Sequence, residues 1–269
     1  AYDHPIIGTN EDFEALTPAD LLDFHQTWYH PNNAVLIVAG DVVPVEVFAL
    51  AEQHFGGFAA VPVPARVRPD AERPFEADFE TVPDALITQP SARRAWRLPE
   101  VVAETGFEAF RARYAARLLS SMLTSGLDAP FTRHLQTERQ IALGAGFSLV
   151  LDEGQDWAIL SVEPVEGQDP VAVLDEAEDF LRNWLENDLT TERLERQKRR
   201  FVNGLVYAAD SIDGPATSFE SVVATNGDYG VFLTLEDTIN SMTIDDIRAV
   251  AALFLDQASA PKTLVLGPL

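Results

Sequence analysis

Five histidines supply every imidazole that this 269-residue chain could use for metal binding or general base catalysis. They are His4, His25, His30, His54 and His134. A zinc-binding helix places two imidazoles on one face by spacing them four residues apart, as in His-x-x-x-His or His-x-x-Glu-His. No pair here has that spacing, and the nearest pair, His25 and His30, is five residues apart. We therefore expect no metal site made from this chain alone.

Other reactive groups give no stronger signal. The chain has no cysteine, which excludes disulfides, thiolate ligands and a thiol nucleophile. It contains no Gly-x-Ser-x-Gly motif, and Gly144-Ala145-Gly146 lacks the third glycine and the following helix of a dinucleotide-binding loop. Five basic residues within 193–200 lie near Glu192 and Glu195 at ion-pair spacing, which favours a solvated helix face.

The charge balance limits the classes of partner. Forty-three Asp and Glu against 19 Lys and Arg give a net charge of −24, which repels phosphate backbones and anionic lipid. We therefore expect neither a nucleic-acid partner nor a membrane-surface one. The composition is 46% hydrophobic, as in globular proteins, and no apolar run approaches the roughly 20 residues of a membrane span.

A pattern near the start of the chain recurs near its end. Thr17 and Thr243 each precede apolar residues at helical spacing, and each is followed three residues later by an aspartate, Asp20 or Asp246. Such a threonine caps a helix, and the aspartate places negative charge where the first N–H groups point. Each pattern therefore predicts a capped helix.

The distance between the two copies predicts the domain organisation. Each helix is followed by a short, largely apolar run, at 34–41 and 262–268, which predicts a strand. The offset of 226 residues suggests a duplicated unit of about that length, although a helix followed by a strand is also common without duplication. We expect 1–60 to be the rear of a first unit without its front, 61–74 a proline-rich linker, and 75–269 a complete second unit.

The remaining sequence alternates between helical and strand patterns. Helices are predicted at 44–54, 104–124, 129–140, 169–187, 190–210 and over most of 215–255, and strands at 75–81, 85–97, 143–151 and 157–162. The last two strands flank a polar turn, which predicts a hairpin. The fold class is therefore α+β, an antiparallel sheet covered by helices, in one partial and one complete copy.

The repeated segment carries a family likeness. Leu16–Leu21 and Trp28–Asp41 closely resemble a segment of the pitrilysin/insulinase metallopeptidases, which include mitochondrial processing peptidase. Within it, Tyr29–Ala34 is the most specific stretch. His4–Thr9 is similar to the preceding part of that family, and the likeness continues through Leu189–Glu195 to the end of the chain.

The resemblance implies paired α/β units that clamp a peptide in a chamber. Zinc in that family is held by an inverted His-x-x-Glu-His motif and a later Glu in the front of the first unit, which is absent here. Zinc is then expected only in a missing segment or a partner, and this chain alone is expected to be inactive. The implied partners are a peptide or unfolded polypeptide substrate and the N-terminal segment, a homologous subunit or a homodimer mate. Bacterial relatives favour a periplasmic or extracytoplasmic location.

The same resemblance nominates substrate-binding positions. The family's second unit usually carries an Arg and a Tyr seven residues apart, which fall here on Gln136 and Leu143. A shifted alignment nominates Arg133 or Arg139, with no Tyr seven residues downstream. The chain is thus expected to be the C-terminal portion of a zinc endopeptidase or, as the lost pair favours, a non-catalytic subunit or paralogue acting in partner activation or assembly. An unrelated acidic binding module is the third possibility.

Overall fold

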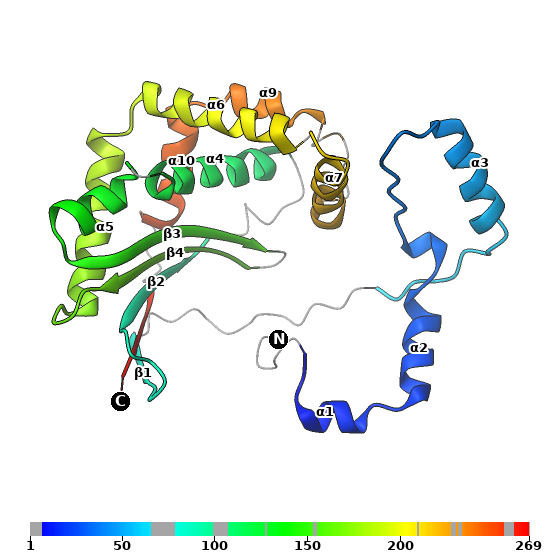
Figure 1. Cartoon of the computed structure of the whole chain (residues 1–269), viewed down its shortest axis with the longest axis horizontal. Helices are drawn as coiled ribbons and strands as arrows, with labels where there is room; N and C mark the ends of the chain where they lie inside the picture. Colours follow the sequence, from blue (N-terminus) through cyan, green and yellow to red (C-terminus); the bar gives the residue numbers. More distant parts are fainter. Residues whose placement is uncertain are drawn as a thin grey trace. The chain divides into compact units, whose positions relative to one another are not determined.

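A computed structural model of the chain consists of two compact units (Figure 1). The first unit is Ala1–Pro74 with Ser211–Glu220, and the second is Phe75–Asp210 with Ser221–Leu269. The structure describes residues 7–65, 79–98, 107–126, 128–152, 155–208, 210–226, 230, 233–255 and 261–268. The predictions for the start of the His4–Thr9 segment, most of the linker and the beginnings of the first strand and of the 104–124 helix lie outside these residues.

The elements follow the chain in the order expected of an α+β protein. They are α1 (Asn10–Ala15), α2 (Pro18–Trp28), η1 (Pro31–Asn33), α3 (Pro44–Phe55), β1 (Phe79–Pro83), β2 (Ser91–Arg97), α4 (Phe107–Thr124), η3 (Thr132–Glu138), β3 (Ala142–Asp152), β4 (Gln155–Pro164), α5 (Pro170–Asn187), α6 (Thr191–Ala208), α7 (Asp213–Asn226), α9 (Leu235–Asn240), α10 (Ile244–Leu255) and β5 (Lys262–Gly267).

The second unit is built on a five-stranded sheet in the order β1-β5-β2-β4-β3. The predicted hairpin is formed by β3 and β4, and β2 pairs antiparallel with both β4 and β5. The sheet is not purely antiparallel, because β5 runs parallel to β1 on its other side. That pairing joins Phe79 to Thr263, and local sequence carries no signal for so distant a neighbour. The α+β class itself is confirmed.

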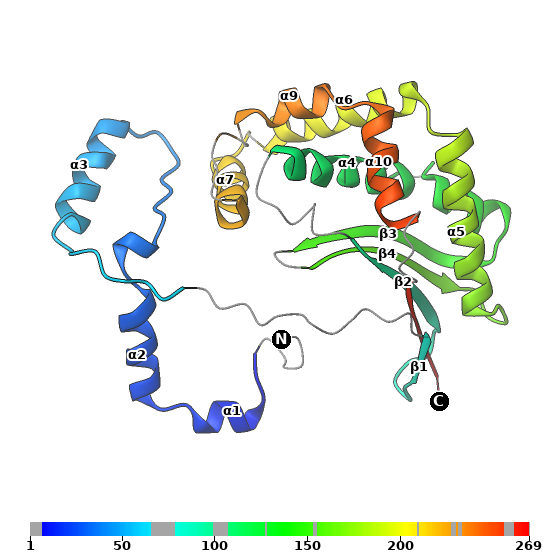
Figure 2. The same cartoon turned by 180° about the vertical axis from the view of Figure 1, so that it is seen from behind.

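Helices cover one face of this sheet in two layers (Figures 1 and 2). The inner layer is α4, α5 and α10, and α6 and α9 lie outside α4. Apolar side chains fill the space between sheet and inner helices. Phe254 of α10 packs against Trp96 of β2 and Phe147 of β3, with ring centroids 5.8 and 5.2 Å apart. This cluster forms the centre of the core.

Local signals in the sequence placed several helices correctly. The predicted stripe on α4 is buried at Phe110, Tyr114, Leu118 and Met122. Asp169 caps α5, because its carboxylate accepts hydrogen bonds from the backbone N–H groups of the two residues after Pro170.

Both predicted helix caps are present. The Thr17 hydroxyl donates to the Asp20 carboxylate at 2.6 Å and accepts from the Asp20 N–H at 3.3 Å. Thr243 and Asp246 make the same pair of bonds, at 2.8 and 3.3 Å. A short helix also precedes each capped helix, α1 before α2 and α9 before α10. The helix-pair likeness is therefore longer than the sequence pattern suggested.

The strand predicted within 34–41 is wrong. These residues lie outside any strand, whereas the corresponding run of the second copy forms β5. A strand forms only when its N–H and C=O groups pair with a neighbour, and the described part of the first unit contains no strand to pair with.

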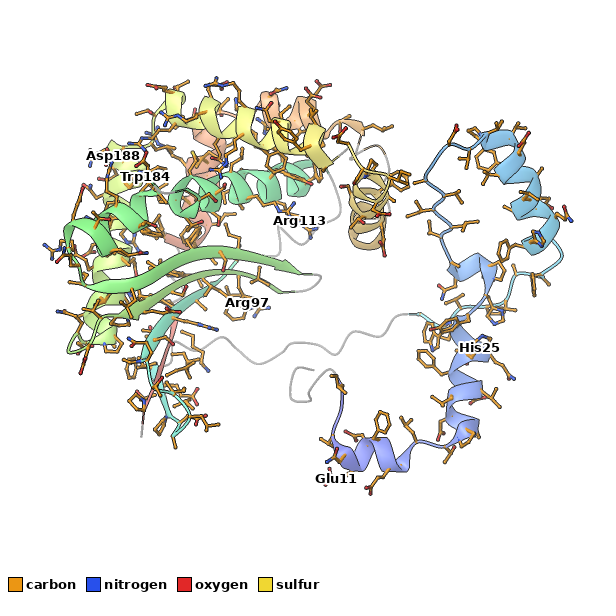
Figure 3. The ribbon with its side chains drawn as sticks, viewed as in Figure 1. Glu11, His25, Arg97, Arg113, Trp184 and Asp188 are labelled. Carbon is orange, nitrogen blue, oxygen red and sulfur yellow. The ribbon has the colours of Figure 1, made fainter. Side chains whose placement is uncertain are left out.

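The first unit has no core of its own among residues 7–65. None of these residues is buried, and Leu21, Phe24 and Phe48 all expose more than half of their surface. Side chains on α1 and α2, where Glu11 and His25 are labelled, extend outward from the ribbon (Figure 3). Apolar side chains that recur at helical spacing normally pack against another element. Here that element is not part of residues 7–65.

None of the described helices is both long and apolar enough to cross a membrane.

Candidate functional site

The nominated substrate-binding positions gather around a π-helix. The helix predicted at 129–140 contains η3, a seven-residue π-helix over Thr132–Glu138. Its i to i−5 pattern appears in the hydrogen bond from the Arg139 N–H to the His134 carbonyl oxygen at 2.9 Å. π-Helical turns of this kind are rare, and those that do occur are often found at functional sites. Three of the four nominated residues lie on η3 or immediately after it.

Ion pairs lie on both sides of this wide turn. Arg133 pairs with Glu138, five residues on, at 3.5 Å, a spacing that suits π rather than α geometry. On the other side, Glu176 of α5 accepts from His134 at 2.9 Å and pairs with Arg139 at 3.4 Å. Both nominated arginines are thus engaged with carboxylates of the same unit. Neither is a free cation awaiting a substrate carboxylate.

An aromatic contact anchors the inner side of the turn. The His134 ring stacks on Phe180 of α5 with centroids 4.3 Å apart, and Leu135 is fully buried. His134 is therefore a packed, hydrogen-bonded side chain that joins η3 to α5. Its placement was not foreseen from the sequence, since α5 lies about forty residues further along the chain.

Gln136 and Leu143 lie on either side of the junction between η3 and β3. Gln136 is half-buried on η3, and Leu143 is exposed at the start of β3. The register of β3 against β4 shifts between Ala142 and Gly144, so Leu143 occupies a β-bulge. Bulges turn a side chain away from the regular alternation and are common beside active sites. The substrate-binding role of these positions stays a prediction.

The turn that joins η3 to β3 places Gln140 in the left-handed region, at φ 52°. The Ile141 N–H reaches back to the Leu135 carbonyl oxygen at 3.0 Å, as in a helix end that normally uses glycine. We expect Gln140→Gly to raise the free energy of unfolding by about 0.5 kcal/mol, because relief of the left-handed conformation outweighs the extra freedom of unfolded glycine. Thermal denaturation measures this gain, and Gln140→Ala, which gives no such relief, is the matched control. An equal gain in both variants would contradict the backbone explanation.

The described residues do not fit a zinc ion. Among them no group of three or more His, Cys, Asp or Glu side chains is placed to hold a metal. The histidines are dispersed: the His25 ring stacks on Tyr29, the His30 ring contacts the Gln26 carbonyl oxygen, and His134 lies in the other unit. His4 lies outside the described residues. We therefore derive no metal-dependent step from this chain.

Known proteins are similar to this chain over most of its length. A model of the peptidase M16 inactive domain matches residues 15–201, more than half of the chain. An uncharacterized zinc protease of Mycobacterium leprae is 24% identical over 268 residues, which cover 98% of this chain and 57% of that protein. The chain thus spans little more than half the length of this relative.

Solved structures share the fold. A protease from Helicobacter pylori matches 97% of this chain and 61% of its own chain, with a TM-score of 0.79 and 19% identity. The first half of the periplasmic protease PqqL from Escherichia coli matches 98% of this chain and 57% of its own, with a TM-score of 0.71 and 18% identity. The metallopeptidase likeness is confirmed, and an unrelated acidic binding module is excluded. The chain belongs to the peptidase M16 family and carries its inactive domain.

Proposed function

We propose that this chain is the C-terminal, non-metal-binding portion of a zinc endopeptidase, and that it forms part of a peptide-binding chamber without being catalytic alone. The observation that carries the proposal is the first unit, where residues 7–65 present apolar helix faces and bury none of them. An exposed apolar surface with no core beneath it is typical of a binding site for another polypeptide. The relatives' additional length offers a source for that polypeptide.

The second copy indicates how the first unit is completed. Ile247 of α10 is 0% exposed in the core of the second unit, whereas Leu21, 226 residues earlier on α2, is 62% exposed. In the second unit β5 lies between β1 and β2, and residues 36–41 are its counterpart by the same offset. Completion therefore requires a polypeptide that flanks 36–41 with one parallel and one antiparallel strand. We name it the front segment: the part of an M16 protein that precedes the region matched here.

The edge of the sheet supports a role in peptide binding. In the described part of the second unit, β3 pairs with β4 on one side only. This 11-residue strand, ALGAGFSLVLD, contains no Lys, Arg or Pro, the residues that usually protect an edge from pairing. Extended peptides bind such edges by adding a strand. The bulge at Leu143 and the η3 turn beside it would then lie at one end of the peptide.

The domain limits and the location belong to the same proposal. We propose 1–60 as the rear of the zinc-bearing unit, 61–74 as a linker and 75–269 as the inactive unit. The division between Pro74 and Phe75 supports these limits, while Ser211–Glu220 groups with the first unit. A periplasmic or other extracytoplasmic location is supported by the structural likeness to PqqL.

Metal analysis and a cleavage assay test this proposal. The chain alone is expected to bind well below one zinc per chain and to leave a fluorogenic peptide library uncut, since no ligand set is available to activate a water molecule. Mixed with the front segment from the same genome, it is expected to form a 1:1 complex that cleaves peptides.

The outcomes separate the two family roles. One tightly bound zinc in the chain alone, or peptide cleavage by it, would contradict the proposal. A 1:1 complex that binds peptide without cutting it would instead favour a non-catalytic subunit or paralogue, the role to which the lost Arg and Tyr at Gln136 and Leu143 point. Failure to form any complex would overturn both.

A further inference from the structure

The helix pair α9–α10 is held by cations from the helices that precede it. Arg111 of α4 donates to both carboxylate oxygens of Asp246, at 2.8 and 2.7 Å, and to the Ser241 carbonyl oxygen at 3.0 Å. Asp246 also completes the cap of α10. A bidentate salt bridge of this kind fixes the orientation of the two side chains as well as their distance. Arg111 therefore sets where α10 begins relative to α4.

Two more cations hold the far ends of the same helices. Lys198 of α6 is buried and donates to the carbonyl oxygen of Asn240, the last residue of α9, at 3.0 Å. Arg182 of α5 donates to the carbonyl oxygen of Leu255, the last residue of α10, at 3.2 Å. Positive charge at a helix C-terminus is favourable because the last carbonyl groups lack partners within the helix. Three separate helices thus supply one cation each.

The helix pair α1–α2 has the same acceptors, but no Lys or Arg lies in the described part of the first unit. By the 226-residue offset, Asp20 corresponds to Asp246, and the carbonyl groups of Glu14, Ala15 and Tyr29 correspond to the other three acceptors. Residues 1–65 and 211–220 contain neither Lys nor Arg, while residues 7–65 contain eight Asp and Glu. Hydrogen bonds from the Thr17 hydroxyl and N–H lower the pKa of Asp20, so its carboxylate is charged at neutral pH. The described part of the first unit thus carries Asp and Glu side chains but neither Lys nor Arg.

We infer that the polypeptide covering α1 and α2 binds them through cationic side chains. The foremost of these is an arginine, on a helix equivalent to α4, that forms a bidentate salt bridge with Asp20. The inference rests on the proposed function and commits to the front segment as the source of that arginine. Leu21 and Phe24, both exposed on α2, lie within four residues of Asp20. Covering them excludes water from the carboxylate, which strengthens a charge pair and makes an unpaired aspartate unfavourable.

Association of the full chain with the front segment tests the inference. We expect Asp20→Asn to weaken binding at least about tenfold in low salt, because the amide still accepts the Thr17 hydrogen bonds but carries no charge. The loss should shrink in 0.5 M salt, where partly solvated charge pairs are screened. Asp23→Asn, on the same helix and equally charged, is the matched control and is expected to change binding less than twofold.

A second variant separates charge from helix capping. Thr17→Ala removes the cap and keeps the Asp20 carboxylate, so any weakening it causes should not depend on salt. Replacing each arginine of the front-segment helix equivalent to α4 should identify one whose loss is not additive with Asp20→Asn. Binding that Asp20→Asn leaves unchanged would overturn this inference and keep the proposed function. No binding by the unmodified chain would overturn both.

Discussion

Replacing Ile247 with alanine is expected to lower the free energy of unfolding of the second unit by about 2–5 kcal/mol. Ile247 of α10 is 0% exposed in the core of the second unit, so truncation removes buried methyl groups and leaves a cavity there. Urea denaturation followed by circular dichroism at 222 nm measures the change. An unchanged slope with a lower midpoint would show that the native unit itself has lost stability.

The counterpart in the first copy is the control for this change. Leu21→Ala removes a similar side chain at the equivalent position, but Leu21 is largely exposed, so the effect in the chain alone is expected to stay within about 0.5 kcal/mol. After complex formation with the front segment the same substitution should become costly. A large effect of Leu21→Ala in the isolated chain would mean that the first unit already has a packed core.

Asp246→Asn is expected to lower the free energy of unfolding at pH 7 by about 2 kcal/mol, a usual value for a hydrogen-bonded group that loses its charge. Asparagine still accepts the cap hydrogen bonds from Thr243, so the loss reports mainly on the pair with Arg111. The Arg111 guanidinium holds the pKa of the Asp246 carboxyl far below its ordinary value.

The pH dependence follows from the direction of that pKa shift. An aspartate in the unfolded chain has a pKa of about 3.9, and the folded value lies lower, so the stabilisation is complete above about pH 5. It is lost as the pH falls from about 4 toward the folded pKa. The difference in stability between the unmodified chain and Asp246→Asn should therefore shrink at pH 3. Asp245→Asn, exposed on the same helical turn, is the control, and an equal difference at pH 7 and pH 3 would contradict the assignment.

Elements governed by neighbouring residues were predictable from the sequence. Thr17 with Asp20, Thr243 with Asp246, and Asp169 before Pro170 mark helix starts because each cap forms within three residues. The hairpin of β3 and β4 is local in the same sense. These signals depend on side chains that meet whatever the rest of the chain does.

Features that depend on distant partners were not predictable. The run at 34–41 has the composition of a strand, yet pairing decides whether a strand forms. The parallel neighbour of β5 and the bond between His134 and Glu176 each join segments whose proximity no local pattern encodes.

The candidate site shows the same division. The resemblance nominated Gln136 and Leu143 as positions, but it did not indicate the π-helix on which Gln136 lies or the contact of that helix with α5, about forty residues further along the chain. The duplicated helix pair was visible in the sequence. The cations that hold only one of its copies were not, since Arg111, Arg182 and Lys198 come from three different helices.

The central place of β5 also determines when the sheet can close. β5 pairs Thr263 with Phe79, residues separated by 184 positions, and it is the last of the five strands to emerge during translation. Until then β1 has no neighbour and β2 lacks one of its two, so a nascent chain carries a split sheet. Contacts between residues so far apart in the sequence slow folding, and until they form the open strand edges can aggregate. A chain that stalls or terminates before β5 is made should therefore keep a split sheet with open strand edges.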